Sequence, residues 1–209
     1  MNRGGVARWL RRGEIALWAL GISLLGGALA TIVISRTYQA RQGRAFSGLD
    51  RLAAAPALGA ASFATVAAPA SSSPPPVGDP LLLGRIEIPR IGLSAMIRDG
   101  DDDATLTVAV GRIPGTARPG ERGNMALAGH RDTFFRALRH VRVDDVIHVR
   151  VPGRRYDYRV ESTEVVGPRE IRVLDPTPEA VLTLVTCHPF GYVGNAPDRF
   201  IVRASRLPD

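Results

Sequence analysis

Residues 146–160, VIHVRVPGRRYDYRV, give the clearest indication of the fold. Apolar and polar side chains alternate on both sides of Pro152-Gly153, which is typical of two antiparallel strands joined by a tight turn. Residues 85–88 show the same alternation, and residues 200–203 form a further short strand that closes the chain. Many short strands without a strand–helix–strand rhythm favour a closed or nearly closed β-barrel, so the expected fold class is mainly β.

Two short helical segments are expected among these strands. One begins at Asp103 and includes residues 104–109. The other covers residues 133–138 with Asp132 as its N-cap, because an aspartate side chain accepts hydrogen bonds from the free N–H groups of a first helical turn. The folded domain then occupies residues 81–209, a length that supports one hydrophobic core.

The formal charge of +7 is distributed unevenly along the chain. Residues 1–80 carry eight arginines and three acidic residues, whereas residues 81–209 carry 19 arginines and 17 acidic residues. A basic excess confined to a terminal segment argues for membrane topology and against nucleic-acid binding. All 27 basic residues are arginine, so lysine-based catalysis such as Schiff-base formation is excluded.

An uncharged run of 21 residues, 15–35, has the composition of a membrane span. At about 1.5 Å per helical residue it matches the roughly 30 Å of bilayer hydrocarbon. Four arginines precede the run and three follow it within ten residues, with one glutamate on the N-terminal side. The positive-inside rule therefore predicts a cytoplasmic segment 1–14 and a single-pass signal anchor 15–35, with the domain outside the cell membrane.

A cleaved signal peptide is the competing interpretation of this segment. Ala28-Leu29-Ala30 has the small-x-small form of a cleavage site. The apolar run continues through residues 31–34, however, and it is longer than a usual signal-peptide core. These two features favour the uncleaved anchor.

The segment 36–80 connects the expected anchor to the domain. Residues 36–50 are polar enough for a juxtamembrane helix, and alanine, serine and proline dominate after them. The triplet 74–76 is all proline, which favours extended polyproline II. The stretch is expected to be a flexible linker whose proline-rich part acts as a semi-rigid spacer.

A lone cysteine, Cys187, ends the apolar run 183–187 and is followed by His188-Pro189. A thiol at the end of a strand, next to a loop that proline interrupts, lies at the rim of a barrel. It becomes a nucleophile at neutral pH when a neighbouring group favours the thiolate or accepts its proton, and that group is usually histidine.

His130 is the strongest candidate among the four histidines. It ends the apolar run 124–130, in which Gly129 permits close approach. His148 lies within a strand and His140 in a helix tail, where structural or surface roles are expected. His188 adjoins Cys187, but successive residues of a strand point to opposite faces.

A cation is expected close to the thiol as well. Arg199 opens the last strand 12 residues after Cys187, and the loop 189–197 lets that strand return as the antiparallel neighbour of the cysteine strand. A guanidinium beside the thiol can donate to an oxyanion, as acyl transfer requires.

The residues together resemble the sortase family of membrane-anchored cysteine transpeptidases. The resemblance is carried by the segments 127–130 (LAGH), 183–187 (TLVTC) and 196–202 (APDRFIV). Residues 129–135, GHRDTFF, are similar to class D members, which commonly have tyrosine at the position of His188. The resemblance covers about residues 84–205.

The resemblance implies an eight-stranded sortase barrel with Cys187, His130 and Arg199 in the catalytic positions. It implies cleavage of an LPxTG-like signal of a secreted protein through a thioester, and transfer to an amine of a peptidoglycan precursor or a pilin. Substrate contacts are expected at Thr186, His188, Ala196 and Pro197. Two alternatives stay open: a catalytically silent peptide-binding scaffold and a hydrolysing cysteine protease.

No metal or cofactor is expected. Several aspartates cluster between positions 99 and 103, but an EF-hand needs glycine at Ala104 and glutamate at Val110. A capped helix start explains this acidic run better. Cys187 with His188 supplies too few ligands for zinc.

Overall fold

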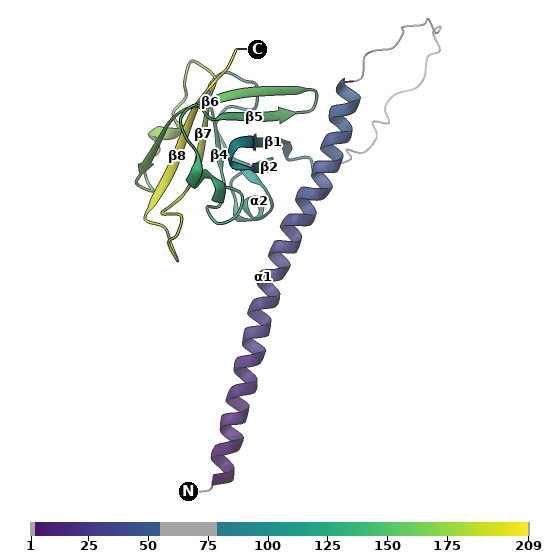
Figure 1. Ribbon diagram of the computed structural model, residues 1–209, viewed down its shortest axis with the longest axis vertical. Helices are drawn as coiled ribbons and strands as arrows, with labels where there is room; N and C mark the ends of the chain where they lie inside the picture. Colours follow the sequence, from purple (N-terminus) through teal and green to yellow (C-terminus); the bar gives the residue numbers. More distant parts are fainter. Residues whose placement is uncertain (1–2, 55–78, 209) are drawn as a thin grey trace, which may run out of the picture.

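The computed structural model describes residues 3–54 and 79–208 and consists of one long helix beside a β-barrel (Figure 1). The helices are α1 (Arg3–Ala54) and α2 (Asp103–Val108), with single 3₁₀ turns at η1 (Pro89–Ile91), η2 (Arg136–His140) and η3 (Arg172–Leu174). The strands are β1 (Leu82–Ile88), β2 (Leu93–Asp99), β3 (Val110–Arg112), β4 (Asn124–Ala128), β5 (Val146–Val151), β6 (Arg154–Val166), β7 (Val181–His188) and β8 (Asp198–Arg206).

The eight strands close into a barrel in the order β1-β2-β3-β4-β7-β8-β6-β5. β2 with β3 and β4 with β7 pair in parallel, and the other neighbours are antiparallel. Alternate residues fill the interior, among them the fully buried Ile86, Leu127, Leu184 and Val202. The expected closed, mainly β barrel is confirmed.

The hairpin expected over residues 146–160 is present. β5 has the predicted bounds, and Gly153 takes a positive φ of 74° in the turn that follows it. β6 begins at Arg154 and continues to Val166, so its second half pairs with β8 beyond the end of β5. The antiparallel pairing with β8 therefore extends the strand past the region where the sequence alternates.

The first expected helix is present and the second is wrong. Asp102 caps α2 by accepting hydrogen bonds from the N–H and the hydroxyl of Thr105, at 3.0 and 2.9 Å. Over residues 133–138 the chain instead makes turns and then the short η2, and Asp132 caps nothing. Phe135 is fully buried against Gly129, and its N–H donates to His130 O, so tertiary packing bends this segment out of a helix.

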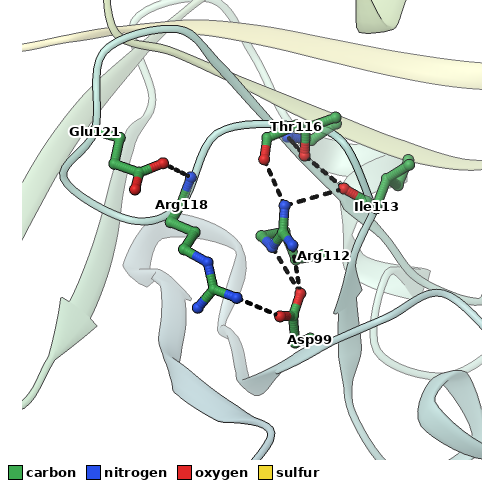
Figure 2. Close-up of polar contacts among 7 residues, drawn as sticks. Asp99, Arg112, Ile113, Thr116, Arg118 and Glu121 are labelled. Carbon is green, nitrogen blue, oxygen red and sulfur yellow. Dashed lines mark hydrogen bonds and ion pairs between the residues drawn. The ribbon is translucent and has the colours of Figure 1, made fainter.

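Asp99, the first acid of the cluster, holds the loop between β3 and β4 (Figure 2). It forms ion pairs of 2.6 Å with Arg112 and 2.8 Å with Arg118. Arg112 is 8% exposed and also donates to the carbonyls of Ile113 and Thr116. Asp99 thus has a structural role. Its carboxylate pairs with the buried guanidinium of Arg112, which would otherwise be an uncompensated charge.

The long helix α1 is the candidate membrane span among the described residues, by length and composition. Its C-terminal half contacts α2 and β2 (Figure 1). The side-chain amide of Gln39 donates to Val108 O at 2.7 Å and accepts from Met96 N–H at 2.9 Å. Phe46, 3% exposed, adds a buried apolar contact. Residues 36–54 belong to this helix, which includes the expected juxtamembrane helix. The proline triplet 74–76 lies outside the described residues.

A second polar link joins the helix to the chain entering the barrel. The Tyr38 hydroxyl donates to Asp79 at 2.8 Å, and Asp79 forms an ion pair of 3.0 Å with Arg98. Burial raises the pKa of Tyr38 above its ordinary value, and the carboxylate of Asp79 raises it further. Tyr38 is therefore a neutral hydrogen-bond donor at physiological pH.

Candidate active site

The lone thiol lies at the end of β7, and its antiparallel neighbour is the expected arginine. Cys187 is half-buried and pairs with Arg199 in the ladder between β7 and β8. The ladder continues by one more pair, His188 with Asp198. The strand is therefore regular through the cysteine, which keeps Cys187 and Arg199 on the same face.

His130 follows β4, which lies on the other side of β7 from β8. β4 runs parallel to β7 with Ala128 opposite Val185, and the N–H of Gly129 donates to Val185 O at 3.2 Å. Continued for two residues, this register sets His130 opposite Cys187. By backbone register, the residues that carry an imidazole, a thiol and a guanidinium are thus neighbours across β7.

Gly129 leaves room for the Phe135 ring beside the chain that leads to His130. A Cβ atom at this position would lie 2.7 Å from Cδ2 of Phe135, a distance that real Cβ contacts do not show. The carbonyl of Gly129 accepts a hydrogen bond of 2.7 Å from the Thr186 hydroxyl. Thr186 is buried, and its hydrogen bond fixes the chain just before His130 relative to the chain just before Cys187.

His188 occupies the opposite face of β7. Its ring stacks on Phe200 with centroids 6.2 Å apart and meets Phe190 edge-on at 6.0 Å. The alternation of side chains in a strand separates this aromatic cluster from the face of Cys187. The imidazole that is nearest to the thiol in sequence is thus turned away from it.

The Arg199 guanidinium has no carboxylate partner among the ion pairs of the described residues. Its Nη1 donates to Ala196 O at 3.3 Å and to Asp198 O at 2.9 Å. These carbonyls orient the side chain without neutralising it, so its positive charge and other N–H groups are available to an oxyanion. Pro197, the neighbour of Ala196, is exposed.

The other two histidines lie elsewhere. His148 Nδ1 is 2.6 Å from Asp157 Oδ1 across the β5–β6 ladder. His140 is an exposed residue of η2. Both positions agree with the structural or surface roles expected for them.

The structure adds Arg131, which links the loop of His130 to the loop between β7 and β8. Its Nη2 donates to the carbonyls of Tyr192 and Gly194 at 2.7 and 2.9 Å, and its guanidinium lies 6.0 Å from the Tyr192 ring centroid. Sequence reasoning missed this residue because its partners lie more than 60 positions away. The only sequence signal is a charge immediately after the candidate histidine.

Asn124 and Thr183 form a buried polar pair that joins β4 and β7 to the connection between β6 and β7. The Asn124 amide donates to the carbonyls of Val173 and Asp175 at 2.9 and 3.2 Å, and its Oδ1 accepts from the Thr183 hydroxyl at 2.7 Å. Val173 belongs to η3, in the connection between β6 and β7. Two polar residues inside apolar strands were the available signal for this network, which sequence reasoning also missed.

The site contains no evident metal centre in the part of the chain that the structure describes, where no three histidine, cysteine, aspartate or glutamate side chains gather. The chemistry available there is a thiol and an uncompensated guanidinium on paired strands, and an imidazole in the chain that follows the neighbouring strand β4. Such a set suits nucleophilic attack on an acyl group, with proton transfer and oxyanion stabilisation.

Comparison with known proteins supports this interpretation. Residues 86–207 match the family model described as a sortase domain. Sortase D of Bacillus subtilis (strain 168) is 34% identical over 125 residues, which are 59% of this chain and 63% of that protein. Sortase A of Listeria monocytogenes (EGD-e) is 29% identical over 110 residues, 51% of this chain and 49% of that protein. The alignments thus span less than two thirds of either relative.

A solved structure shows the same barrel. The sortase D5 transpeptidase of Clostridium perfringens superposes with a TM-score of 0.56 at 30% sequence identity. The superposition covers 61% of this chain and 79% of the Clostridium protein.

Proposed function

The chain belongs to the sortase family and is class D-like, and on this premise we propose that it is a membrane-anchored cysteine transpeptidase of the cell envelope. The observation that carries the proposal is the β4–β7–β8 arrangement: Cys187 on β7 pairs with Arg199 on β8, and His130 follows two residues after the end of β4, the other neighbour of β7. The proposed catalytic domain is 81–209.

The first half-reaction forms a thioester. The thiolate of Cys187 attacks the carbonyl carbon of the threonine–glycine bond in an LPxTG-like sorting signal. Arg199 and backbone N–H groups near the cysteine stabilise the oxyanion, and His130 protonates the leaving amine. Ala196 and Pro197, in the loop between β7 and β8, are proposed to contact the peptide.

The second half-reaction determines the biological outcome. An amine of a peptidoglycan precursor or a pilin attacks the thioester and yields a new amide, whereas water yields hydrolysis. His130, neutral after the first step, accepts a proton from the incoming amine. No cofactor enters either half-reaction.

A peptide assay with the full-length chain in detergent tests this function. A sorting-signal peptide is supplied with and without an amine acceptor, and products and intact protein masses are followed by mass spectrometry. We expect a peptide adduct on Cys187 and an amide product when the amine is present. Peptide binding without an adduct would support the scaffold alternative. An adduct that only water resolves, at saturating amine, would support a protease.

The proposed topology follows from the helix and its flanking charges. Segment 1–14 is cytoplasmic, 15–35 crosses the bilayer once, and the chain from 36 onward, including the barrel, lies outside. Tyr38 and Gln39 lie just after the proposed span. The Tyr38 side chain hydrogen-bonds to the chain that enters the barrel, and the Gln39 side chain hydrogen-bonds to α2.

Protease treatment of intact spheroplasts is expected to release the barrel, because the proposed topology exposes it. A C-terminal epitope tag, followed by immunoblotting, should disappear from the spheroplasts, while a cytoplasmic marker protein stays intact as the control. A C-terminal tag that is protected until the membrane is lysed would reverse the orientation.

A further inference from the structure

Helix α1 and the His130 end of the barrel lie at the same height. Residues of α1 between positions 31 and 36 surround one space of about 570 Å³ together with His130 and Asp132 of the chain that follows β4. The side-chain hydrogen bonds of Tyr38 and Gln39 hold the barrel at this height along the helix. The His130 end of the barrel is therefore level with the last turn of the proposed span, which ends at residue 35.

The charges that flank the proposed span fix how deep this level lies. Arg11, Arg12 and Glu14 precede the uncharged run, so lifting the barrel away from the bilayer would pull charged side chains into hydrocarbon. Arg36 follows the run on the outer side. Residue 31 lies only about 6 Å inside that boundary, at about 1.5 Å per helical residue. The chain that carries His130 thus lies at the border between the hydrocarbon and the outer headgroups.

The loop between β7 and β8, residues 189–197, lies at this same end of the barrel. β4 and β7 run in parallel, so the chain after β4 and the loop after β7 leave the barrel on the same side. Nη2 of Arg131 links the two by donating to the carbonyls of Tyr192 and Gly194 at 2.7 and 2.9 Å. In Figure 1 the loop extends from the lower end of the barrel towards the N-terminal half of α1. It therefore reaches the proposed membrane surface.

The composition of this loop suits a membrane interface. Residues 189–197 carry no charge, although residues 81–209 contain 19 arginines and 17 acidic residues. Val193, in the middle of the loop, is 94% exposed, the highest value for a large apolar side chain among the described residues, and Tyr192 is 49% exposed. An exposed valine alone is ordinary on a protein surface. A tyrosine beside an apolar side chain, level with the end of a membrane span, is the composition of a membrane interface.

We propose that the loop between β7 and β8 inserts into the outer headgroup layer of the bilayer, with Val193 against the lipid chains and Tyr192 at the headgroups. The partner of this surface is the lipid bilayer that holds α1. The inference rests on the proposed function, because it takes the anchor and the topology given there. Ala196 and Pro197, which are proposed to contact the peptide, belong to the same loop, so the sorting signal is bound within the headgroup layer.

A fluorescent label on the loop tests the insertion. In a Cys187→Ala background, Val193→Cys supplies the one thiol of the chain, which is labelled with a nitrobenzoxadiazole dye. The full-length protein is reconstituted into vesicles of phosphatidylcholine and phosphatidylglycerol. Quenching is measured with a lipid that carries a nitroxide near the top of its acyl chain, and separately with iodide in the water. Because the background lacks the nucleophile, neither readout depends on transpeptidation.

Val146→Cys in the same background is the matched control. Val146 is also an exposed valine, at 37%, and it begins β5. β5 crosses the upper part of the barrel, away from the loop between β7 and β8 (Figure 1). Its label is expected to remain in water.

We expect the nitroxide lipid to quench the Val193 label at least about threefold more than the Val146 label, because inserted side chains lie about 5–10 Å deep at the border of headgroups and acyl chains. Iodide should show the reverse order. Asn195→Cys labels the same loop and leaves Val193 intact, and it should follow the Val193 label with weaker quenching. In that chain Val193→Asp should lower the lipid quenching about twofold, because a carboxylate avoids the hydrocarbon border, whereas Val146→Asp should not change it.

Each other outcome overturns a defined part. Equal quenching of the Val193 and Val146 labels, in a chain that stays bound to the vesicles, would overturn the insertion of the loop. An Asn195 signal that Val193→Asp does not change would remove Val193 from the contact. A chain that an alkaline carbonate wash removes from the vesicles would instead overturn the proposed anchor. Far-UV circular dichroism of every labelled variant verifies that the barrel is folded.

Discussion

Replacing Cys187 with alanine is expected to abolish formation of the thioester, because no other thiol exists in the chain. The side chain is half-buried at a strand end, so removal of one sulfur atom leaves the barrel folded. The measurement is the intact mass of the full-length protein after incubation with sorting-signal peptide. Val185→Ala, a truncation on the same face of β7 two residues earlier, is the matched control and should still form the adduct.

The same measurement applies to the neighbouring cation. Arg199→Ala removes one oxyanion donor and should slow acylation by about 10²–10³-fold. Arg203→Ala, on the same face of β8 four residues later, should stay within a small factor of the wild-type rate. An adduct on the Cys187→Ala protein would contradict the nucleophile assignment, and normal acylation of Arg199→Ala would reduce that arginine to a surface charge.

The second large effect separates the two histidines near the thiol. General acid–base groups contribute about 10²–10⁴-fold, so His130→Ala should lose at least the lower of these factors in transpeptidation. His188→Tyr, the residue common in class D members, should stay within a small factor, because its ring packs against Phe190 and Phe200 on the other face of β7. Both variants are assayed with peptide and amine across a range of pH.

Thermal unfolding of each histidine variant provides the control for folding. A folded but inactive His188→Tyr together with an active His130→Ala would exchange the two roles. That result would also mean that the β7 ladder breaks before Cys187 in solution, contrary to the pairs of Cys187 with Arg199 and His188 with Asp198.

The sequence predicts the local parts of this fold well. The β5–β6 hairpin depends on alternation and a tight turn within 15 residues, and all of that information is contiguous. β3 has three residues and pairs in parallel with β2, so neither its length nor its pattern identifies it in advance. The helix expected over residues 133–138 fails for a similar reason, because the packing of Phe135 against Gly129 is a tertiary contact.

The candidate site divides in the same way. Cys187 and Arg199 are brought together by one short loop between neighbouring strands, and this proximity follows from chain order alone. The apolar run and Gly129 mark His130 as a candidate, but its place opposite Cys187 depends on the parallel pairing of β4 with β7 across more than 50 residues, which no local pattern predicts. Arg131 and Asn124 contact carbonyl groups 61 and 49 positions away, and no local pattern predicts such partners.

The Gln39 amide, which joins α1 to both α2 and β2, has a consequence for how the protein meets other molecules. If α1 is the membrane anchor that we propose, a barrel held against it keeps a nearly constant height and tilt over the bilayer, so its reach is limited to a thin layer above the lipid. Within that layer, encounters with other membrane-bound molecules become lateral diffusion in two dimensions, and the effective concentration follows their surface density. Crowding of acceptors into patches of membrane would then raise the turnover of this protein even at a constant cellular amount of acceptor.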